Sequence, residues 1–285
     1  MKSSLVLTKA AVVASLALCI PACAAPTEGD DAPEDTNLGS SADELSILGT
    51  VGWGGTTPLN IGSASNRTCF LTGVHGELWG TDNYGNNDEA SVKVFISGGS
   101  WFIQADPGNG AGIIGHATCI PTSAAVNATR TFHGLSATKP NVTEGLHTRG
   151  PNEQCFITEL AGTSGWAAWN TSSARTTRAS RWIGGVLTPV WLSTLNVGDQ
   201  AHPGNVYARM RTVCFDLAVN ATHHGQFTSG TANTSLPNAA CGLTGVAGNF
   251  HDAPLSTGVE VFPNSSGTWT MTASPGETIW IDCHQ

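Results

Sequence analysis

The segment Cys69-Phe-Leu-Thr-Gly-Val-His-Gly76 returns twice along the chain, as Cys155-Phe-Ile-Thr-Glu-Leu-Ala-Gly162 and as Cys241-Gly-Leu-Thr-Gly-Val-Ala-Gly248. The starts of the three segments are 86 and 86 residues apart, which identifies an internal repeat. After each segment come a polar, glycine-rich stretch, an apolar run that contains or leads to a tryptophan, and an alternating strand that ends at a second cysteine. The prediction of the fold starts from this repeat.

The second cysteines of the repeats are Cys119, Cys214 and Cys283. An even number of cysteines in an exported chain predicts disulfides, and export is predicted by the leader described below. The matched positions predict the pairs Cys69–Cys119, Cys155–Cys214 and Cys241–Cys283, each tying the first strand of a unit to its last. A zinc site would need close pairs such as Cys-x-x-Cys, and these six cysteines form none.

Short β-branched and aromatic runs of period two, separated by Gly, Asn, Thr and Ser, predict an all-β chain. Each unit has roughly 70–90 residues, and we place the three units at 47–124, 125–217 and 218–285. We expect a pseudo-threefold assembly, a β-prism or a trefoil-like fold, and the alternative is three small β-sandwich-like domains in a row. The expected core positions are Leu71, Val74, Val92, Val94, Trp101, Leu243, Val246, Val259, Val261 and Trp269, and we assign Trp191 and Trp280 to the core as well.

The first 23 residues have the pattern of a secretory signal peptide, because Lys2 and Lys9 precede a short apolar run and a small-residue exit. Ile20-Pro-Ala-Cys23 resembles a bacterial lipobox, which implies cleavage before Cys23 and lipidation of that cysteine. Ordinary cleavage after Ala24 or Ala25 is the alternative. Residues 24–46 are acidic and rich in Pro and Ser, and we expect them to be a disordered tether.

The net charge of −9 is unevenly placed along the chain. Seven of the 21 acidic residues precede residue 45, so the remaining chain has 14 acidic and ten basic residues, a net charge of −4. A near-neutral domain on an acidic tether is a poor binder of polyanions, which argues against nucleic acid as a partner. We expect a bacterial surface or envelope lipoprotein, or an extracellular protein, that meets the membrane only through a lipid on Cys23. In a eukaryote, sequons at Asn66, Asn127, Asn141, Asn170, Asn220, Asn233 and Asn264 would instead indicate a glycosylated secreted protein.

Two variable loops combine aromatic rings with amides and carboxylates, groups that suit the apolar faces and hydroxyls of sugars. The predicted ligand-binding residues are Trp79, Asp82, Asn83, Tyr84, Asn86 and Asp88 in the first loop, and Trp166, Trp169 and Asn170 in the second. The acidic residues of the first loop are also the type that holds calcium, although their spacing is not that of an EF-hand. A solvated, turn-rich loop has the same composition.

The sequence predicts no catalytic residue, no metal site and no cofactor other than the calcium alternative. The adjacent His223 and His224 would point to opposite faces of a strand and therefore do not form a chelating pair. No Gly-x-Ser-x-Gly motif is present. Arg175, Arg178 and Arg181 form the one basic cluster, which we assign to a solvated loop.

These features together predict a secreted or surface-tethered binding protein, lectin-like or adhesive, that recognises glycans or a surface partner through variable loops. One alternative is a secreted polysaccharide hydrolase or lyase, which would need two carboxylates in one cleft. The other is a structural envelope or matrix protein. The sequence does not predict the oligomeric state.

Overall fold

The described part of the chain consists of strands, turns and loops, without a helix, so the all-β prediction is confirmed. The computed structural model describes residues 49–78, 89–108, 112–122, 126–137, 142–150, 152–162, 172–196, 208–217, 222–234, 239–250 and 253–284. No helix in these ranges is long and apolar enough to cross a membrane. The predicted signal peptide, the tether and Cys23 lie outside them and stay predictions.

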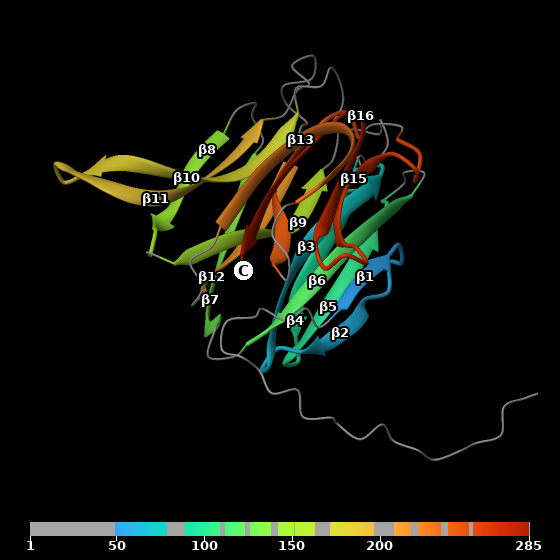
Figure 1. Cartoon of the computed structure of the whole chain (residues 1–285), viewed down its shortest axis with the longest axis horizontal. Helices are drawn as coiled ribbons and strands as arrows, with labels where there is room; N and C mark the ends of the chain where they lie inside the picture. Colours follow the sequence, from blue (N-terminus) through green and yellow to red (C-terminus); the bar gives the residue numbers. More distant parts are fainter. Residues whose placement is uncertain are drawn as a thin grey trace, which may run out of the picture. The chain divides into compact units, whose positions relative to one another are not determined.

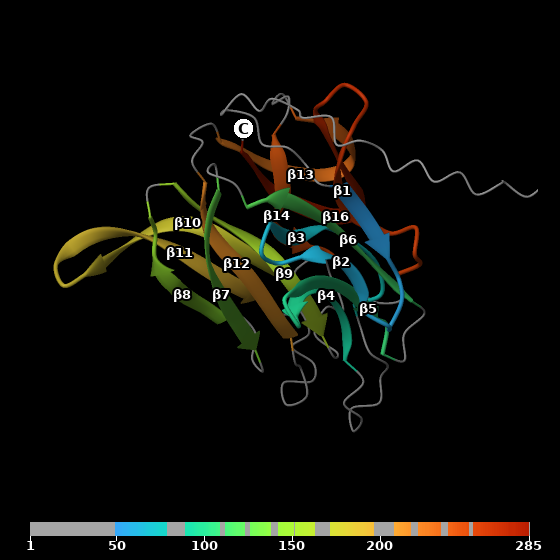
Figure 2. The same cartoon turned by 90° about the horizontal axis from the view of Figure 1, so that it is seen from below.

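The strands form two sheets (Figures 1 and 2). The larger sheet has, in spatial order, β1 (Gly49–Trp53), β6 (Ile113–Pro121), β3 (Arg67–Gly76), β15 (Gly258–Pro263), β16 (Trp269–His284), β14 (Ala240–Ala247), β10 (Ser173–Ile183), β11 (Val186–Asn196) and β8 (Val142–Thr148), and β13 (Thr222–Asn233) pairs with β16. The smaller sheet has β2 (Leu59–Ser63), β5 (Ser100–Asp106), β4 (Ala90–Ser97), β9 (Glu153–Gly162), β12 (Ala208–Leu217) and β7 (Val126–Ala137). Neither path of paired strands closes on itself.

Three disulfides join the cysteine pairs that the repeat predicts: Cys69–Cys119, Cys155–Cys214 and Cys241–Cys283. In each pair the two cysteines are direct partners on neighbouring antiparallel strands, β3 with β6, β9 with β12, and β14 with β16. The Cα–Cα distances of 4.1, 4.0 and 4.0 Å are those of such directly opposed residues. Each bridge therefore ties the strand of a unit's first cysteine to the last strand of that unit. This strand is not the first of its unit, because β1 and β2 precede β3, β7 and β8 precede β9, and β13 precedes β14.

The threonine that follows each first cysteine by three residues lies at a β-bulge. The register shifts around Thr72 in β3, around Thr158 in β9 and around Thr244 in β14, and all three side chains are buried. A bulge inserts one extra residue and turns the following side chains to the other face of the strand. The repeated threonine thus sets which face Gly73, Glu159 and Gly245 occupy.

Strands from different predicted units also pair directly. β4 pairs with β9, β10 pairs with β14, and β15 pairs with β3. One cluster of buried side chains includes residues from all three units. The prism-like or trefoil-like arrangement of the units stays a prediction.

The expected core positions other than Trp280 are buried, including Trp101, Trp191 and Trp269. A second cluster of buried residues contains Phe70 and Phe156, whose rings stack with centroids 4.2 Å apart. Gly242 occupies the corresponding place in the third segment, and a Cβ atom there would lie 2.6 Å from both rings. The third segment therefore has room for no side chain where the first two have phenylalanine.

The hairpin of β10 and β11 extends beyond the neighbouring strands (Figures 1 and 2). Its tip turns at Gly184-Gly185, which both have positive φ, and exposes Trp182, Ile183, Val186 and Leu187. Trp182 is 74% exposed. A group of large apolar side chains in water is typical of a contact surface.

Glu277 is a buried carboxyl group at the bend of β16. It is 2% exposed, and its Oε2 has no hydrogen-bond partner among the described residues. Burial raises the pKa of Glu277 to about 8. The folded protein therefore holds a proton here that the unfolded chain releases near pH 4.5, so the free energy of unfolding falls as the pH rises from about 4.5 to about 8.

Replacing Glu277 by Gln is expected to remove this part of the pH dependence. At pH 9 we expect the variant to exceed the wild type in free energy of unfolding by about 1–2 kcal/mol, because the wild type must bury a charge or open locally. Urea unfolding at pH 5, 7 and 9 measures the difference, with the exposed carboxyl of Asp216 replaced by Asn as the control. Parallel pH profiles for Glu277→Gln and the wild type would contradict the prediction.

Candidate functional site

The binding residues predicted from the sequence lie outside the described part of the chain. These are Trp79, Asp82, Asn83, Tyr84, Asn86, Asp88, Trp166, Trp169 and Asn170. The glycan-binding and calcium hypotheses for these two loops therefore stay predictions, and the candidate site is built from the described strands.

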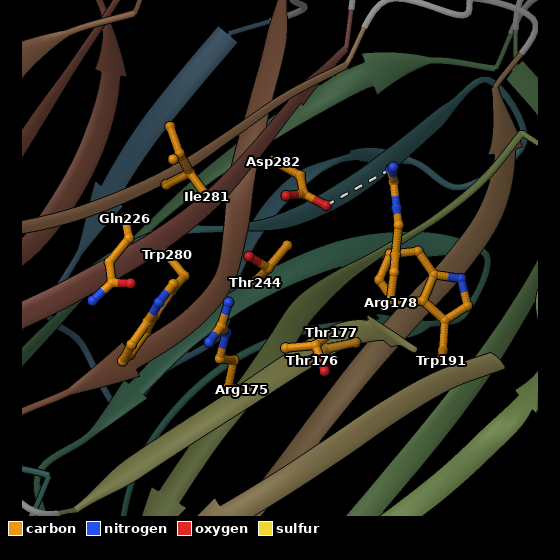
Figure 3. A pocket seen from close by; sticks show the side chains of 11 residues that line it. Arg175, Thr176, Thr177, Arg178, Trp191, Gln226, Thr244, Trp280, Ile281 and Asp282 are labelled. Carbon is orange, nitrogen blue, oxygen red and sulfur yellow. Dashed lines mark ion pairs between the residues drawn. The ribbon is translucent and has the colours of Figure 1, made fainter. Parts of the chain in front are cut away.

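A pocket of about 290 Å³ lies where β10 separates from β14 (Figure 3). The two strands pair only from Ser173 to Arg175, and beyond this point β10 continues with β11 alone as its partner. Residues from five strands line the space: Arg175, Thr176, Thr177 and Arg178 of β10, Trp191 of β11, Gly225 and Gln226 of β13, Thr244 of β14, and Trp280, Ile281 and Asp282 of β16.

Arg175 and Trp280 meet over a glycine at one side of this pocket. Gly245 of β14 is the direct partner of Arg175 on one side and of Trp280 on the other. A Cβ atom on Gly245 would lie 2.9 Å from both side chains, so only glycine leaves room for them. The guanidinium carbon of Arg175 lies 4.8 Å from the centre of the Trp280 ring, a cation–π contact. No carboxylate among the described residues lies within ion-pair distance of Arg175.

Arg178 lies over the ring of Trp191, with its guanidinium carbon 5.4 Å from the ring centre. Its Nη2 donates a hydrogen bond to Gln154 Oε1 at 2.6 Å and lies 3.9 Å from Asp282 Oδ2, as the dashed line in Figure 3 shows. Gln154 Nε2 in turn donates to Asp282 Oδ2 at 2.6 Å. Burial lowers the pKa of both Arg175 and Arg178, and the charge of Asp282 opposes the shift. Both guanidiniums stay charged at neutral pH.

The two indole N–H groups at the pocket lack partners among the described residues. Trp191 Nε1 and Trp280 Nε1 are shielded from water and make no hydrogen bond there. The corresponding N–H groups of Trp101 and Trp269 donate to backbone carbonyls. Trp280 is only half-buried and lines the pocket, so assigning it fully to the core was wrong.

The basic cluster is likewise placed differently from the prediction. Arg175, Arg178 and Arg181 lie on strand β10 and not in a solvated loop. The stretch Ser173-Ala-Arg-Thr-Thr-Arg-Ala-Ser-Arg181 lacks apolar alternation because β10 leaves β14 after Arg175 and its outer part covers no core. The sequence feature that indicates the site is the close spacing of Arg175 and Arg178, because residues 45–285 have only ten basic residues.

The junction of β4 with β9 has a different set of side chains in the corresponding place. Lys93 and Arg211 are the two direct partners of Glu159. The Glu159 carboxylate forms ion pairs with Arg211 at 2.9 Å and with Arg209 at 2.6 Å, and Arg209 also pairs with Glu89 at 2.9 Å. The two arginines at this junction therefore have carboxylate partners, whereas Arg175 has none among the described residues.

The junction of β15 with β3 brings together the one group of three metal-ligating side chains found in the described residues, His75, His116 and Glu260. Burial alone would raise the pKa of Glu260, but the imidazoles of His116 and His75 beside it lower it to about 2. This cluster lies on β3, β6 and β15, none of which lines the pocket, and it was not predicted from the sequence.

The pocket combines a cation without a carboxylate partner among the described residues, the indole of the half-buried Trp280 and the amide of Gln226, and the fully buried Trp191 lies beneath Arg178. Such a set can hold an anionic group and an apolar ring face at the same time. Comparison of the chain with protein-family models, curated proteins and solved structures gave no match.

Proposed function

We propose that the protein is an exported, lectin-like binding protein that recognises acidic glycans of a surface through the pocket between β10 and β16. The observation that carries the proposal is Arg175, a guanidinium that rests on the face of Trp280 and has no carboxylate partner among the described residues. A partly desolvated guanidinium of this kind forms strong, paired hydrogen bonds with a carboxylate.

The other pocket residues suit a sugar ring. The C–H face of a sugar packs against indole, and its hydroxyl groups pair with the amide of Gln226 and the hydroxyls of Thr177 and Thr244. A volume of about 290 Å³ is at the low end for ligand pockets and fits one ring and its substituents rather than a long chain segment. The acidic unit of a glycan would therefore occupy the pocket, and neighbouring units would extend into solvent.

Export and surface contact have separate support. Disulfides persist in oxidising compartments, which fits the leader and the lipobox-like Ile20-Pro-Ala-Cys23. The exposed apolar tip of the β10–β11 hairpin suits contact with a surface partner. The predicted loops of residues 79–88 and 166–170 stay candidates for additional sugar contacts.

Binding of the full chain to matched acidic and neutral oligosaccharides, such as glucuronate-containing and glucose-only tetramers, tests the proposal by calorimetry. We expect binding of the acidic set only, and Arg175→Gln should weaken it at least tenfold, since a charge-assisted pair is lost. Arg181→Gln is the matched control, because Arg181 lies on the same strand but does not line the pocket. Equal binding of neutral sugars, or no effect of Arg175→Gln, would refute the proposal.

The hydrolase or lyase alternative lacks comparable support. Paired-carboxylate chemistry needs two acidic groups across the substrate, and Asp282 is the one carboxylate among the described residues that line the pocket.

We further infer that the three units are arranged about a pseudo-threefold axis. Each unit pairs with the next in a cyclic order, β4 on β9, β10 on β14 and β15 on β3. Phe70, Phe156 and Gly242, which correspond to one another in the repeat, meet in one cluster. The pocket then lies at one of three related junctions. Its binding groups are side chains that the other two junctions do not have.

A further inference from the structure

The junction of β15 with β3 has Gly73 at its centre, as the junction of β10 with β14 has Gly245. Strand β3 lies between β6 and β15, and Gly73 is the direct partner of His116 on β6 and of Glu260 on β15. Because Gly73 has no side chain, these two side chains meet above it. His75 follows two residues later on β3 and therefore lies on the same face of the sheet. His116 Nδ1 is 2.8 Å from Glu260 Oε1, and His75 Nε2 is 3.5 Å from Glu260 Oε2.

Glycines in the neighbouring strands leave room for both imidazole rings. A Cβ atom on Gly52 of β1 would lie 3.0 Å from His116 Cε1, and one on Gly258 of β15 would lie 2.7 Å from the Cγ of His75. Together with Gly73, these glycines form a cradle that side chains would fill. Rings fixed on paired strands form a more rigid site than residues on loops do.

The repeat shows that the scaffold does not need histidine here. Ala161 and Ala247 occupy the place of His75 in the other two segments, and the place of His116 is taken by Arg211 and Trp280. His75 Nε2 is moreover shielded from solvent, and it lies 3.5 Å from Glu260 Oε2, a longer contact than the 2.8 Å between His116 Nδ1 and Glu260 Oε1. A buried nitrogen with so long a contact is poorly satisfied, which favours a ligand here.

We propose that His75, His116 and Glu260 bind a zinc ion at the junction of β3, β6 and β15. Two imidazole nitrogens and one carboxylate oxygen are a common zinc ligand set, and the three ligand atoms lie within 4.8 Å of one another. Small side-chain movements bring such atoms to zinc-binding distances of about 2.0–2.2 Å. The nitrogen of His116 that binds the metal must carry no proton, so zinc would take the place of the contact between His116 Nδ1 and Glu260 Oε1.

The site would leave one zinc position for water or a ligand atom, as in other sites with three protein ligands. His75, His116 and Glu260 are 20%, 23% and 20% exposed, so an ion can enter from solvent. Since the ligands come from strands of the first and third predicted units, the ion would also fasten β15 to β3.

Zinc titration of the metal-free full chain by calorimetry tests the proposal. We expect one zinc ion at this site with a Kd in the micromolar range or tighter, and at least tenfold weaker binding in His75→Ala and Glu260→Gln. His75→Ala introduces the residue that the other two segments have, so it should fold. His133→Ala on β7, outside the cluster, should bind zinc as the wild type does.

A second measurement separates this site from zinc held by other histidines of the chain. Zinc should raise the Tm of the wild type and of His133→Ala, and it should leave the Tm of His75→Ala and Glu260→Gln unchanged. Cobalt in place of zinc should give the visible absorption of a four-coordinate ion only where the cluster is intact. Undiminished zinc binding in both cluster variants would overturn the proposal. So would the absence of binding by the wild type at a zinc concentration 100-fold above the expected Kd.

Discussion

Replacing Cys69 and Cys119 together by alanine is expected to lower the free energy of unfolding by about 4 kcal/mol at 25 °C. The bridge closes a sequence separation of 50 residues, and in the chain-entropy description its main effect is to restrict the unfolded chain. Both sulfurs are buried in the folded domain, so two alanines add only a small cavity to this loss.

The other two bridges provide the matched comparison. They close separations of 59 and 42 residues, and because the loop term grows only with the logarithm of length, all three double variants should lose similar stability. Urea unfolding of the three variants measures this, with each compared to the oxidised wild type. A loss below about 1 kcal/mol for any one of them would contradict the prediction.

Gly242→Ala is expected to destabilise the protein by about 2–3 kcal/mol, the second largest effect. The new methyl group would lie 2.6 Å from ring atoms of Phe70 and Phe156, and both rings are fully buried. Atoms cannot approach so closely, so the stacked rings or β14 must shift, and close-packed interiors resist such shifts.

Gly134→Ala on β7 is the control for this change. A Cβ atom there meets only Arg211 Cγ at 3.7 Å, an ordinary contact, and alanine suits a strand better than glycine. We expect Gly134→Ala to be neutral or slightly stabilising in thermal unfolding. If Gly242→Ala is also neutral, the packing of the three first-cysteine segments against one another is looser than the distances indicate.

The sequence alone could predict the bridges and most of the core, because both follow from the repeat. Matched cysteines define the pairs, and alternation places residues such as Val92, Val94 and Trp101 inside. Periodicity reports whether a side chain faces the core, and it does so well for strands that cover a core along their whole length.

The two candidate sites could not be predicted in the same way. The sequence pattern does not show β10 as a strand, because its polar outer half pairs only with β11. Gly73 and Gly245 look like any glycine of the repeat, and only the pairing of three strands shows that two side chains of a candidate site meet above each of them. The bulge at the preceding threonine adds a change of face that no two-residue period reports.

The different side chains at the three junctions also bear on how the chain finds its native order of units. If β15 paired with β9 instead of β3, Glu260 would lie beside Glu159, and two carboxylates would face each other without the histidines of β3 and β6. Like charges in direct apposition disfavour such a pairing. A chain of three similar units can pair the wrong strands during folding. Charge repulsion between such strands thus raises the free energy of the incorrect order of units.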